Sequence, residues 1–421
     1  MTQGASKQLV LESAVRSAAE RLSAFFDPTP LQKNRSWSDQ YEADIFFKRE
    51  DLNVVRSYKV RGALNKMLSL GADEISKGVV CASAGNHAQG VAYSAAHLGV
   101  HATIYMPTVT PQQKVQRVAL WGGDNVDIVL KGDDFDDAYA MAMEDSKRHG
   151  KMFIHPFNDL DIIAGQGTVG LEVRNQLAGT TPDYIIMPIG GGGLSSGVST
   201  VLKKHYPECK FIGAEPLGAP AMHNSIQNGS CVELRDIDGF VDGAAVRKVG
   251  NLTYQICVEN LDRVLLVPEG KLCTTILQLY NEEAIVAEPA GVLALSALDQ
   301  IREEIKGKKV VCILSGGNND ILRMEEIKER SLLHEGLKHY FIIRFPQRAG
   351  ALKEFLNALG PDDDISHFEY TKKNNRAKGP ALVGIELKRK EDYHPLLQRM
   401  DKLHINYQTL NDSPLLFEML V

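Results

Sequence analysis

Residues 184–204 read Tyr-Ile-Ile-Met-Pro-Ile-Gly-Gly-Gly-Gly-Leu-Ser-Ser-Gly-Val-Ser-Thr-Val-Leu-Lys-Lys, and their order decides the type of fold. The short apolar run Tyr184–Pro188 predicts a buried strand, and residues 195–204 have helical spacing. Four consecutive glycines between them leave main-chain N–H groups unobstructed at the positive end of the following helix. A strand, a glycine loop and a helix in this order form one unit of an α/β fold, and the loop suits a phosphate group.

The glycine loop differs from the standard nucleotide-binding signatures. A GxGxxG loop needs glycine at position 195 or 196, where serine stands, and a Walker A loop needs Gly-Lys-Ser or Gly-Lys-Thr after the glycines. A flexible turn is the alternative interpretation. Because the loop joins a strand to a helix, we expect phosphate binding by the main-chain N–H groups of Gly190, Gly191, Gly192, Gly193 and Leu194.

Apolar runs alternate with longer amphipathic segments through the first 330 residues. This alternation predicts a mostly parallel sheet wrapped by helices, whose ligands bind at the carboxyl ends of the strands. Candidate strands lie at Asp44–Glu50, Val79–Ala82, Ala102–Met106, Val126–Val129, Tyr184–Pro188, Phe211–Ala214 and Val310–Leu314. Candidate helices lie at Leu9–Leu22, Val60–Leu70, Ala88–Leu98, Pro111–Trp121 and Asp134–His149.

The composition changes near residue 330, where the stretch Arg323–His334 is dense in charge. The remainder predicts the β-α-β-β-α-β order of a ferredoxin-like unit. Its predicted elements are Tyr340–Phe345, Ala349–Leu359, Ile365–Tyr370, Ala381–Leu387, Tyr393–Leu403 and Leu415–Val421. We therefore expect a large domain over residues 1–330, with a small subdomain at about 55–165 inserted in it, and a separate domain over residues 331–421.

The composition narrows the class of protein. The 421 residues suffice for two or three domains, since single hydrophobic cores stop growing at roughly 250 to 300 residues. A net charge of -6 argues against nucleic acid or an anionic membrane as the main partner. No apolar run approaches the ~18 residues of a membrane span, and the first residues lack a signal peptide's apolar core, so we expect a cytoplasmic protein. Six scattered cysteines without a CxxC pair indicate neither a disulfide framework nor a zinc site.

Residues 56–62, Arg-Ser-Tyr-Lys-Val-Arg-Gly, place Lys59 where a loop enters a helix. Repulsion from Arg56 and Arg61, together with partial burial, would lower the pKa of the Lys59 amine. A neutral amine can attack an aldehyde. A lone lysine near a helix start is usually a solvated surface residue, but the motifs downstream favour the reactive interpretation.

Two further loops follow predicted strands at the same edge of the sheet. Residues 83–87, Ser-Ala-Gly-Asn-His, open a helix, so their N–H groups suit a carboxylate, and the Asn86 amide can donate to a ring oxygen. An ordinary helix N-cap is the alternative. Ser315 follows the last strand of the large domain, where its hydroxyl would face a heteroaromatic nitrogen or cap the next helix.

Other polar residues favour structural roles. Glu288 stands alone before a helix, where a single acid is more often a cap or a partner of the helix dipole than a catalyst. His155 and His223 occur singly without ligand spacing, so a structural or surface role is expected. The aspartates within residues 133–137 predict a solvated helix start.

Together the motifs SYKVRGA, SAGNHAQG, AGQGT, GGGGL and SGGNND resemble those of the pyridoxal-phosphate enzymes of the tryptophan-synthase-β fold type, and most closely those of the threonine dehydratases. The similarity runs from about Thr29 through Asn319. It implies an α/β fold of two open, mostly parallel sheets wrapped by helices (fold type II). The tail after residue 330 resembles one copy of the ACT-like regulatory unit of biosynthetic threonine dehydratases, a ferredoxin-like α+β domain.

The resemblance implies a role for each motif in the reaction. Lys59 would hold pyridoxal 5'-phosphate covalently, yield it to the amino group of L-threonine and then take the proton from Cα. Hydroxide would leave from Cβ, and 2-oxobutyrate and ammonia would form. Asn86 would donate to the pyridine 3-oxygen, and the loop from Gly190 to Leu194 would bind the phosphate.

The resemblance also assigns the substrate site and the ring nitrogen. The substrate carboxylate would be held by Ser83, Ala84, Gly85, Asn86 and His87, with Ser83 in a catalytic role. Ser315 would meet the pyridine nitrogen. Because a neutral hydroxyl does not stabilise a protonated ring, prompt β-elimination is favoured over transamination.

The resemblance implies a threonine dehydratase at the committed step of isoleucine biosynthesis, inhibited by isoleucine and assembled as a homo-oligomer through its ACT-like unit. One alternative is a serine/threonine dehydratase or racemase without isoleucine control, for which L-serine would be a substrate. Another is a non-catalytic amino-acid sensor, against which Lys59 and the complete set of cofactor residues argue.

Some members similar to serine racemase bind a divalent cation near a Glu-Pro segment, which Glu215-Pro216 matches here. Glu215 and Ala219 could supply two oxygens, but Ala221 stands where such members have an acidic ligand. Because magnesium and calcium need several oxygen ligands, we expect no metal site.

Overall fold

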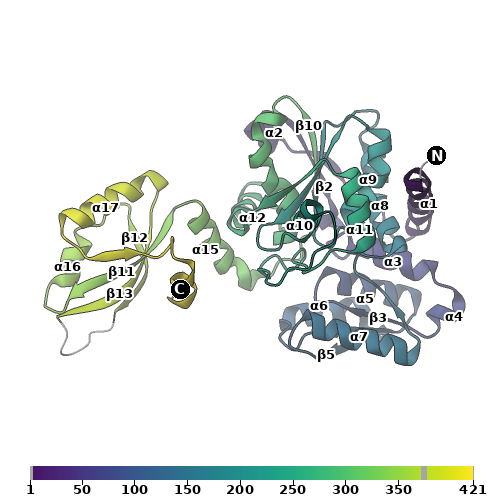
Figure 1. Cartoon of the computed structure of the whole chain (residues 1–421), viewed down its shortest axis with the longest axis horizontal. Coiled ribbons are helices and arrows are strands. Elements are labelled where there is room, and N and C mark those ends of the chain that lie inside the picture. Colours follow the sequence, from purple (N-terminus) through teal and green to yellow (C-terminus); the bar gives the residue numbers. More distant parts are fainter. Residues whose placement is uncertain (1–2, 371–376, 421) are drawn as a thin grey trace. The chain divides into compact units, whose positions relative to one another are not determined.

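The computed structural model describes residues 3–370 and 377–420. The chain forms two units, Met1–Ile321 and Leu322–Val421, and Figure 1 labels many of their helices and strands. The boundary expected near residue 330 falls inside helix α15 (Met324–His334), which belongs to the second unit. None of the described helices is long and apolar enough to cross a membrane.

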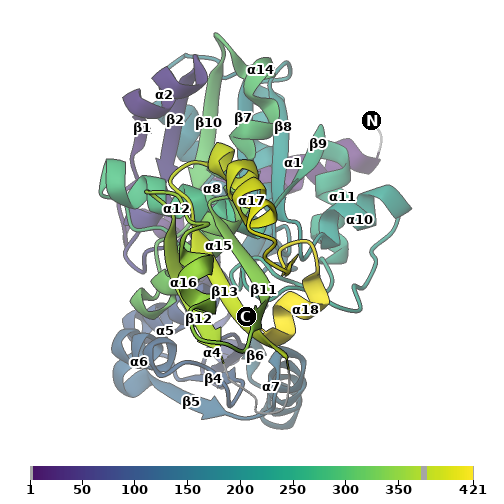
Figure 2. The ribbon, with the colours of Figure 1, turned by 90° about the vertical axis from the view of Figure 1, so that its left-hand side faces the viewer.

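A six-stranded sheet forms the centre of the first unit. Figure 2 shows its strands side by side in the order β1 (Leu31–Lys33), β2 (Asp44–Arg49), β10 (Lys309–Leu314), β7 (Tyr184–Pro188), β8 (Lys210–Pro216) and β9 (Arg263–Val267). All neighbours pair in parallel except β1 and β2, which are antiparallel. The predicted mostly parallel sheet is therefore confirmed.

Helices cover this sheet because its central strands are apolar on both faces. Helices α1 (Gln3–Leu22), α8 (Leu160–Gln176) and α9 (Gly193–His205) pack against one another and share a core with Ile185 and Met187 of β7. Helix α13 (Leu293–Ser296) contacts β7, β8 and β10, and its buried residues lie outside that core. It therefore covers the opposite face.

A second, four-stranded sheet occupies the lower part of the first unit in Figure 1. Its parallel strands run in the order β5 (Val126–Leu130), β4 (Ala102–Met106), β3 (Val79–Ala82) and β6 (Met152–Phe153). Helices α5 (Asn86–Leu98) and α6 (Gln112–Gly122) pack in one core with the strands, and α7 (Phe135–His149) packs in another. The predicted fold of two sheets is confirmed.

Helix α3 (Lys59–Ser69) packs against α5 of the small sheet and α8 of the large one, and glycines bring the backbones close. A Cβ at Gly90 of α5 would lie 3.0 Å from Val60 Cα, and one at Gly165 of α8 would lie 2.5 Å from the Arg61 carbonyl oxygen. No side chain separates the helices at these crossings. The close packing on both sides fixes the helix whose first residue is Lys59.

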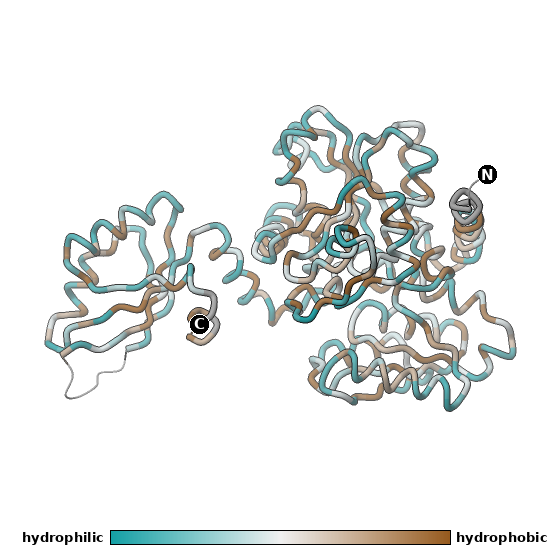
Figure 3. Tube along the Cα trace, viewed as in Figure 1, coloured by the Kyte–Doolittle hydropathy of each residue, from teal (hydrophilic) through white to brown (hydrophobic). Residues whose placement is uncertain are grey.

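Further helical elements complete the fold. They are α2 (Arg35–Tyr41), α4 (Ala72–Ile75), α10 (Ala221–Asn228), α11 (Asn251–Asn260), α12 (Glu269–Glu283), α14 (Arg302–Ile305) and the 3-10 turns η1 (Glu50–Leu52), η2 (Gly123–Asn125), η3 (Pro289–Val292), η4 (Ala297–Ile301), η5 (Ile321–Arg323) and η6 (Lys390–Asp392). Figure 3 shows hydrophobic residues along the strands and hydrophilic residues on the outer helices and loops. The apolar runs of the sequence are thus the buried strands.

The second unit is an antiparallel sheet with helices. Its elements follow in the order β11 (Lys338–Pro346), α16 (Ala351–Leu356), β12 (Asp364–Tyr370), β13 (Lys378–Glu386), α17 (Tyr393–Lys402), β14 (Tyr407–Thr409) and α18 (Pro414–Leu420). The strands lie in the order β12-β13-β11-β14, and each neighbouring pair is antiparallel. The predicted β-α-β-β-α-β order is confirmed.

The predicted last strand, Leu415–Val421, is wrong. Its described part is helical, Val421 lies outside the described residues, and the fourth strand is β14. A short apolar run does not distinguish a strand from a buried helical turn. The helix lets the Phe417 ring pack edge-on against Tyr340 of β11, with the ring centres 5.4 Å apart.

We expect Gly165→Val to destabilise the first unit. The new Cβ would lie 2.5 Å from the Arg61 carbonyl oxygen and 2.7 Å from Gly62 Cα, so α3 and α8 must separate. Such overpacking costs about 1–3 kcal/mol, which chemical unfolding of the cofactor-free protein measures. Gly239→Ala is the control, because the space around that position is open and a change within ~0.5 kcal/mol is expected. Equal stability of both variants would contradict the close crossing.

Candidate active site

Three of the sequence motifs directly follow the carboxyl ends of parallel strands. Residues 83–87 follow β3, residues 190–194 follow β7, and Ser315 follows β10. Lys59 is the first residue of α3. In an open α/β sheet this edge is where ligands bind.

Main-chain hydrogen bonds join the lysine loop to the loop after β10. The Tyr58 N–H donates to the Ser315 carbonyl at 3.3 Å, and the Gly317 N–H donates to the Arg56 carbonyl at 2.9 Å. Arg56 has a φ of 58°, a left-handed conformation that residues other than glycine adopt rarely. The turn held by these bonds sets the direction in which the chain enters α3.

The Lys59 side chain is partly buried at the start of α3. Its Nζ donates to the Pro156 carbonyl at 3.2 Å. Burial lowers the pKa of Lys59 to about 8, although the Glu288 carboxylate acts in the opposite direction. The expected repulsion from neighbouring arginines is wrong as a cause, because Arg61 is paired with two carboxylates. With this pKa, part of the Lys59 population is a neutral, nucleophilic amine near pH 7.

The glycine loop, residues 190–194, forms a concave backbone surface, which we call the glycine cradle, and side chains on its glycines would fill this space. A Cβ at Gly191 would lie 2.2 Å from the Phe157 ring, and Gly192 has a φ of 87°, which requires glycine. In the part of the chain that the structure describes, the N–H groups of residues 190–194 donate no main-chain hydrogen bond outside α9. These groups, at the N-terminus of a 13-residue helix, can bind an anion.

The turn at residues 155–158 connects the glycine loop to Lys59. The Phe157 ring lies against Gly191, and the residue before it, Pro156, accepts the lysine hydrogen bond. The His155 Nδ1 accepts the N–H groups of Phe157 and Asn158 at 3.1 and 2.9 Å, and burial lowers its pKa to about 4. His155 therefore has the structural role that the sequence predicts.

Asn86 is held by two neighbours. Its Nδ2 donates to Glu288 Oε1 at 2.5 Å, and its Oδ1 accepts from Asn318 Nδ2 at 2.8 Å. The Asn318 amide also donates to the Val55 carbonyl at 2.8 Å, which ties the asparagine loop to the lysine loop. Because Asn86 Nδ2 carries a second N–H, it can still donate to a ring oxygen.

Glu288 is the site residue that sequence reasoning missed. Glu288 stands at the N-cap position of η3, but its side chain makes no capping hydrogen bond, so of the two expected roles the side-chain cap is wrong. Burial and the charge of Asp242 raise its pKa to about 7, although the hydrogen bond from Asn86 acts in the opposite direction. A Cβ at Gly316 would lie 2.2 Å from Glu288 Oε1, so that glycine makes room for the carboxyl group. Glu288 and Asn86 lie 202 residues apart in the sequence, and only the fold brings them together.

Residues 83–87 form the start of α5 without a side-chain cap. The Ser83 hydroxyl accepts the Gly85 N–H at 3.3 Å, and residues 83–86 are partly exposed. His87 is buried, with Nε2 2.8 Å from the Ile154 carbonyl oxygen, and burial lowers its pKa to about 3. The His87 ring is therefore neutral, so a carboxylate at this position would depend on main-chain N–H groups.

Ser315 is buried beside η3. Its hydroxyl donates to the Ala290 carbonyl at 3.2 Å, and its N–H donates to the Gly291 carbonyl at 3.2 Å. The next helical element, η5, begins only at Ile321, so Ser315 is no helix cap. A hydroxyl oxygen has further acceptor capacity and can meet a ring nitrogen.

The arrangement fits pyridoxal 5'-phosphate. The glycine cradle offers N–H groups to a phosphate, and Lys59 offers an amine to an aldehyde. Asn86 and Ser315 offer an amide and a hydroxyl to the ring oxygen and the ring nitrogen.

Comparison with known proteins agrees with this chemistry. A family model of pyridoxal-phosphate dependent enzymes matches residues 22–316, and a model of the C-terminal regulatory domain of threonine dehydratase matches residues 329–420. The biosynthetic L-threonine dehydratase of Halalkalibacterium halodurans is 57% identical over 93% of the chain and 95% of that protein. That of Bacillus subtilis is 56% identical over 93% of each. The chain belongs to the biosynthetic threonine dehydratase family.

Membership of the threonine dehydratase family confirms the predicted cofactor and class of enzyme: the chain is a pyridoxal-phosphate-dependent lyase. It also rules out the non-catalytic sensor. Threonine deaminase isoform 2 of Solanum lycopersicum is 37% identical and superposes with a TM-score of 0.74 over 77% of the chain and 94% of that structure. Maize serine racemase is 30% identical and superposes with a TM-score of 0.70 over 76% of the chain and 98% of that structure.

Glu215, considered above as a cation ligand, caps a helix instead. Its carboxylate accepts the N–H groups of Met222 and His223 at 2.7 and 2.9 Å, at the start of α10. Burial raises its pKa to about 8. Among residues 3–370 and 377–420, no group of three or more His, Cys, Asp or Glu side chains could hold a metal ion.

We expect Glu288→Gln to lower the pKa of Lys59. The Glu288 carboxylate raises the pKa of the amine by its negative charge, so its removal lowers that pKa below about 8 and increases the neutral fraction at pH 7. The pH dependence of Lys59 acetylation by acetic anhydride in the cofactor-free protein, followed by peptide mass spectrometry, measures this shift. Glu282→Gln, an exposed change on α12, is the control. An unchanged or higher pKa in E288Q would refute the coupling of Lys59 to Glu288.

Proposed function

We propose that the chain dehydrates and deaminates L-threonine to 2-oxobutyrate and ammonia, the committed step of isoleucine biosynthesis, in the cytoplasm. The observation that carries this proposal is the amine of Lys59, which has a pKa of about 8. Lys59 begins α3, and the loop before it is hydrogen-bonded to the loop that contains Ser315. The similarity to relatives named biosynthetic L-threonine dehydratases supports threonine as the substrate.

Bound pyridoxal phosphate supplies an aldehyde that condenses with amines and a ring that accepts the electron pair left after loss of the Cα proton. Lys59 is the proposed attachment residue. The Lys59 Nζ would be the base that takes the Cα proton of the substrate. A buried amine with a pKa of about 8 suits both steps, because it is a nucleophile when neutral and holds a proton when charged.

The neighbouring residues orient the reactants. The N–H groups of residues 83–87 hold the substrate carboxylate at the start of α5, and the loop of residues 190–194 holds the phosphate. Asn86, fixed by Glu288 and Asn318, donates to the ring oxygen. Ser315 would meet the ring nitrogen with a neutral hydroxyl, which carries no charge that would stabilise a proton there.

The formation of 2-oxobutyrate from L-threonine by the purified holoenzyme tests this reaction. We expect Lys59→Ala to lower the rate by roughly 10²- to 10⁴-fold, because it removes the base that takes the Cα proton. A wild-type enzyme that converts L-serine faster than L-threonine would support the serine dehydratase alternative. A holoenzyme that turns over neither amino acid would refute the proposal.

We also propose isoleucine as the effector of the second unit. A pocket of about 140 Å³ lies where β11 ends and α16 begins. Phe345, Phe368 and Tyr370 line it with aromatic rings, and Leu352 and Arg348 line it from the α16 side. An aliphatic side chain fits such apolar walls, and a guanidinium can bind a carboxylate.

We also propose that the chain assembles as a homo-oligomer through its second unit. Strands β12 and β14 are the edges of the sheet in the second unit. Edge strands present N–H and C=O groups that can pair with another chain. The exposed Phe368 on β12 adds apolar surface at one of these edges.

We expect Leu352→Ala to raise the isoleucine concentration for half-maximal inhibition about tenfold, because losing half of a buried leucine contact costs about 1.4 kcal/mol. The rate without isoleucine should stay unchanged. Leu356→Ala is a matched control: the residue lies four positions further along α16 and is 47% exposed, against 45% for Leu352, but it does not line the pocket. Equal effects of both variants, or none from L352A, would refute this location of the effector site.

A further inference from the structure

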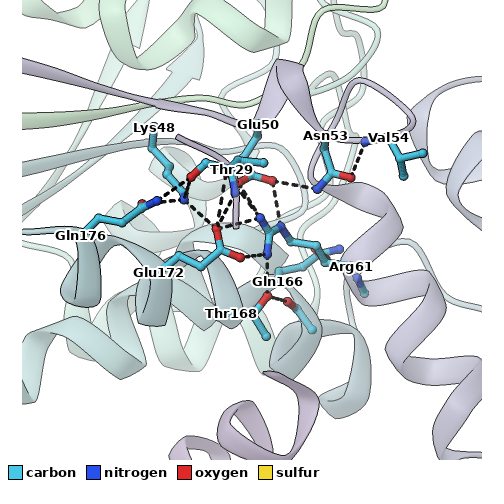
Figure 4. A network of polar contacts seen from close by, with 12 residues as sticks. Thr29, Lys48, Glu50, Asn53, Val54, Arg61, Gln166, Thr168, Glu172 and Gln176 are labelled. Carbon is cyan, nitrogen blue, oxygen red and sulfur yellow. Dashed lines mark hydrogen bonds and ion pairs between the residues drawn. The ribbon is translucent and has the colours of Figure 1, made fainter. Parts of the chain in front are cut away.

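A network of buried charged residues lies beside the first turn of α3 (Figure 4). We call it the Arg61 network; its members are Thr29, Lys48, Glu50, Arg61, Thr168, Glu172 and Gln176. The side chains of Lys48 and Glu50 are 0% exposed, that of Arg61 1% and that of Glu172 14%. Two positive and two negative side chains balance in charge, but none belongs to the catalytic groups described above.

Two carboxylates hold Arg61 at once. Its Nε and Nη2 donate to Glu50 at 2.8 and 2.9 Å, while Nη1 and Nη2 donate to Glu172 at 2.5 and 3.0 Å. Its Nη1 also donates to Thr168 Oγ1 at 3.1 Å. A planar guanidinium held on two sides cannot rotate or shift without breaking several charge-assisted hydrogen bonds.

Lys48 completes the network from β2. Its Nζ donates to the Thr29 carbonyl at 2.5 Å, to Glu172 Oε2 at 2.6 Å and to Gln176 Oε1 at 2.9 Å. Burial opposes the ionisation of Glu50, but the Arg61 guanidinium and the Lys48 ammonium hold its pKa below the ordinary value. The carboxylate that holds Arg61 is therefore ionised at neutral pH.

The Arg61–Glu50 pair closes the loop that carries Lys59. Glu50 follows the end of β2 and Arg61 lies in the first turn of α3. The segment between them includes the loop to α3 and Lys59, the first residue of that helix. Other ion pairs join α3 to α8 further along the helix, where Lys66 contacts Asp159 and Asp161 at 2.9 and 3.0 Å. The ion pairs of the Arg61 network, in contrast, hold the first turn of α3.

Stability alone does not account for such a network. Buried ion pairs are often no more stabilising than apolar residues of the same volume, because the desolvation of the charges offsets their attraction. Their directional bonds instead select one geometry. In this chain, they select the geometry of the first turn of α3, where Arg61 lies two residues after Lys59 in the sequence.

We propose that the Arg61 network is a positioning device for Lys59: by holding Arg61 between Glu50 and Glu172, it fixes the first turn of α3 and the direction of the amine. This inference rests on the proposed attachment of the cofactor to Lys59. Arg61, Glu50 and Glu172 are positioning residues, because they act on the reaction through the backbone of α3.

Condensation of the full-length, cofactor-free protein with pyridoxal phosphate tests the proposal. The Lys59 amine adds to the aldehyde and water leaves, and a visible absorption band reports the rate. We expect Arg61→Lys, which keeps the charge but loses the planar fork, to slow condensation and lower kcat for L-threonine by about ten- to a hundredfold, with KM changed less than about threefold. Thr168→Val removes one acceptor and should produce a smaller change in the same direction.

Lys66→Ala is the matched control, since it removes the two ion pairs that join α3 to the start of α8 further from Lys59. It should lower the unfolding midpoint but leave condensation and kcat unchanged. Wild-type rates in a folded R61K would overturn the proposal, as would an equal loss in K66A. If R61K does not fold, an unchanged T168V overturns it and a slowed T168V supports it. A wild-type protein that condenses at Lys59 but does not dehydrate threonine refutes the proposed function alone.

Discussion

The burial of the Lys59 amine is the constraint on which the rest of the site depends. An ammonium group removed from water loses hydration, so its pKa falls to about 8 and the amine can act as a nucleophile. Phe157 lies against the glycine loop, and the Pro156 carbonyl accepts the hydrogen bond of the amine, so this turn encloses one side of Lys59. Charges close by must also be neutralised, and the two carboxylates on Arg61 do so.

Close approach of backbones gives the site its geometry. Glycines at positions 90 and 165 allow α5 and α8 to touch α3, and the glycines of residues 190–193 open a cradle at the start of α9. A Cβ added at Gly90, Gly165 or Gly191 would lie 3.0 Å or less from a neighbouring atom. The same residue type therefore serves two purposes: it docks the helix that carries Lys59, and it exposes N–H groups for a phosphate. Gly316 adds a third use, since it leaves room for the Glu288 carboxyl group.

Two buried acids of the catalytic unit, Glu50 and Glu288, differ in what they contact. Glu50 lies between cations, which keep it ionised and make it a structural partner. Glu288 accepts an amide N–H from Asn86 and lies near the negative charge of Asp242, and its pKa of about 7 lets it gain or lose a proton at neutral pH. Burial is common to both, so the neighbouring charges decide which acid holds a fixed charge and which one titrates.

The sequence by itself determined the alternation of strands and helices, the place of Lys59 at the start of α3, the glycine loop after β7 and the two-unit organisation, because these depend on local spacing of apolar residues and glycines. Local pattern also has limits, because it does not reveal the two-residue strand β6 and it misassigns the helical residues 415–420 as a strand. Strand β9 was missed as well, although its apolar run is a signal that could have predicted it. Tertiary structure alone decided that Glu288 meets Asn86, that burial and not arginine repulsion lowers the pKa of Lys59, and that Arg61 is held by Glu50 and Glu172. These facts depend on contacts between residues far apart in the chain, and only folding brings such charges close enough to interact.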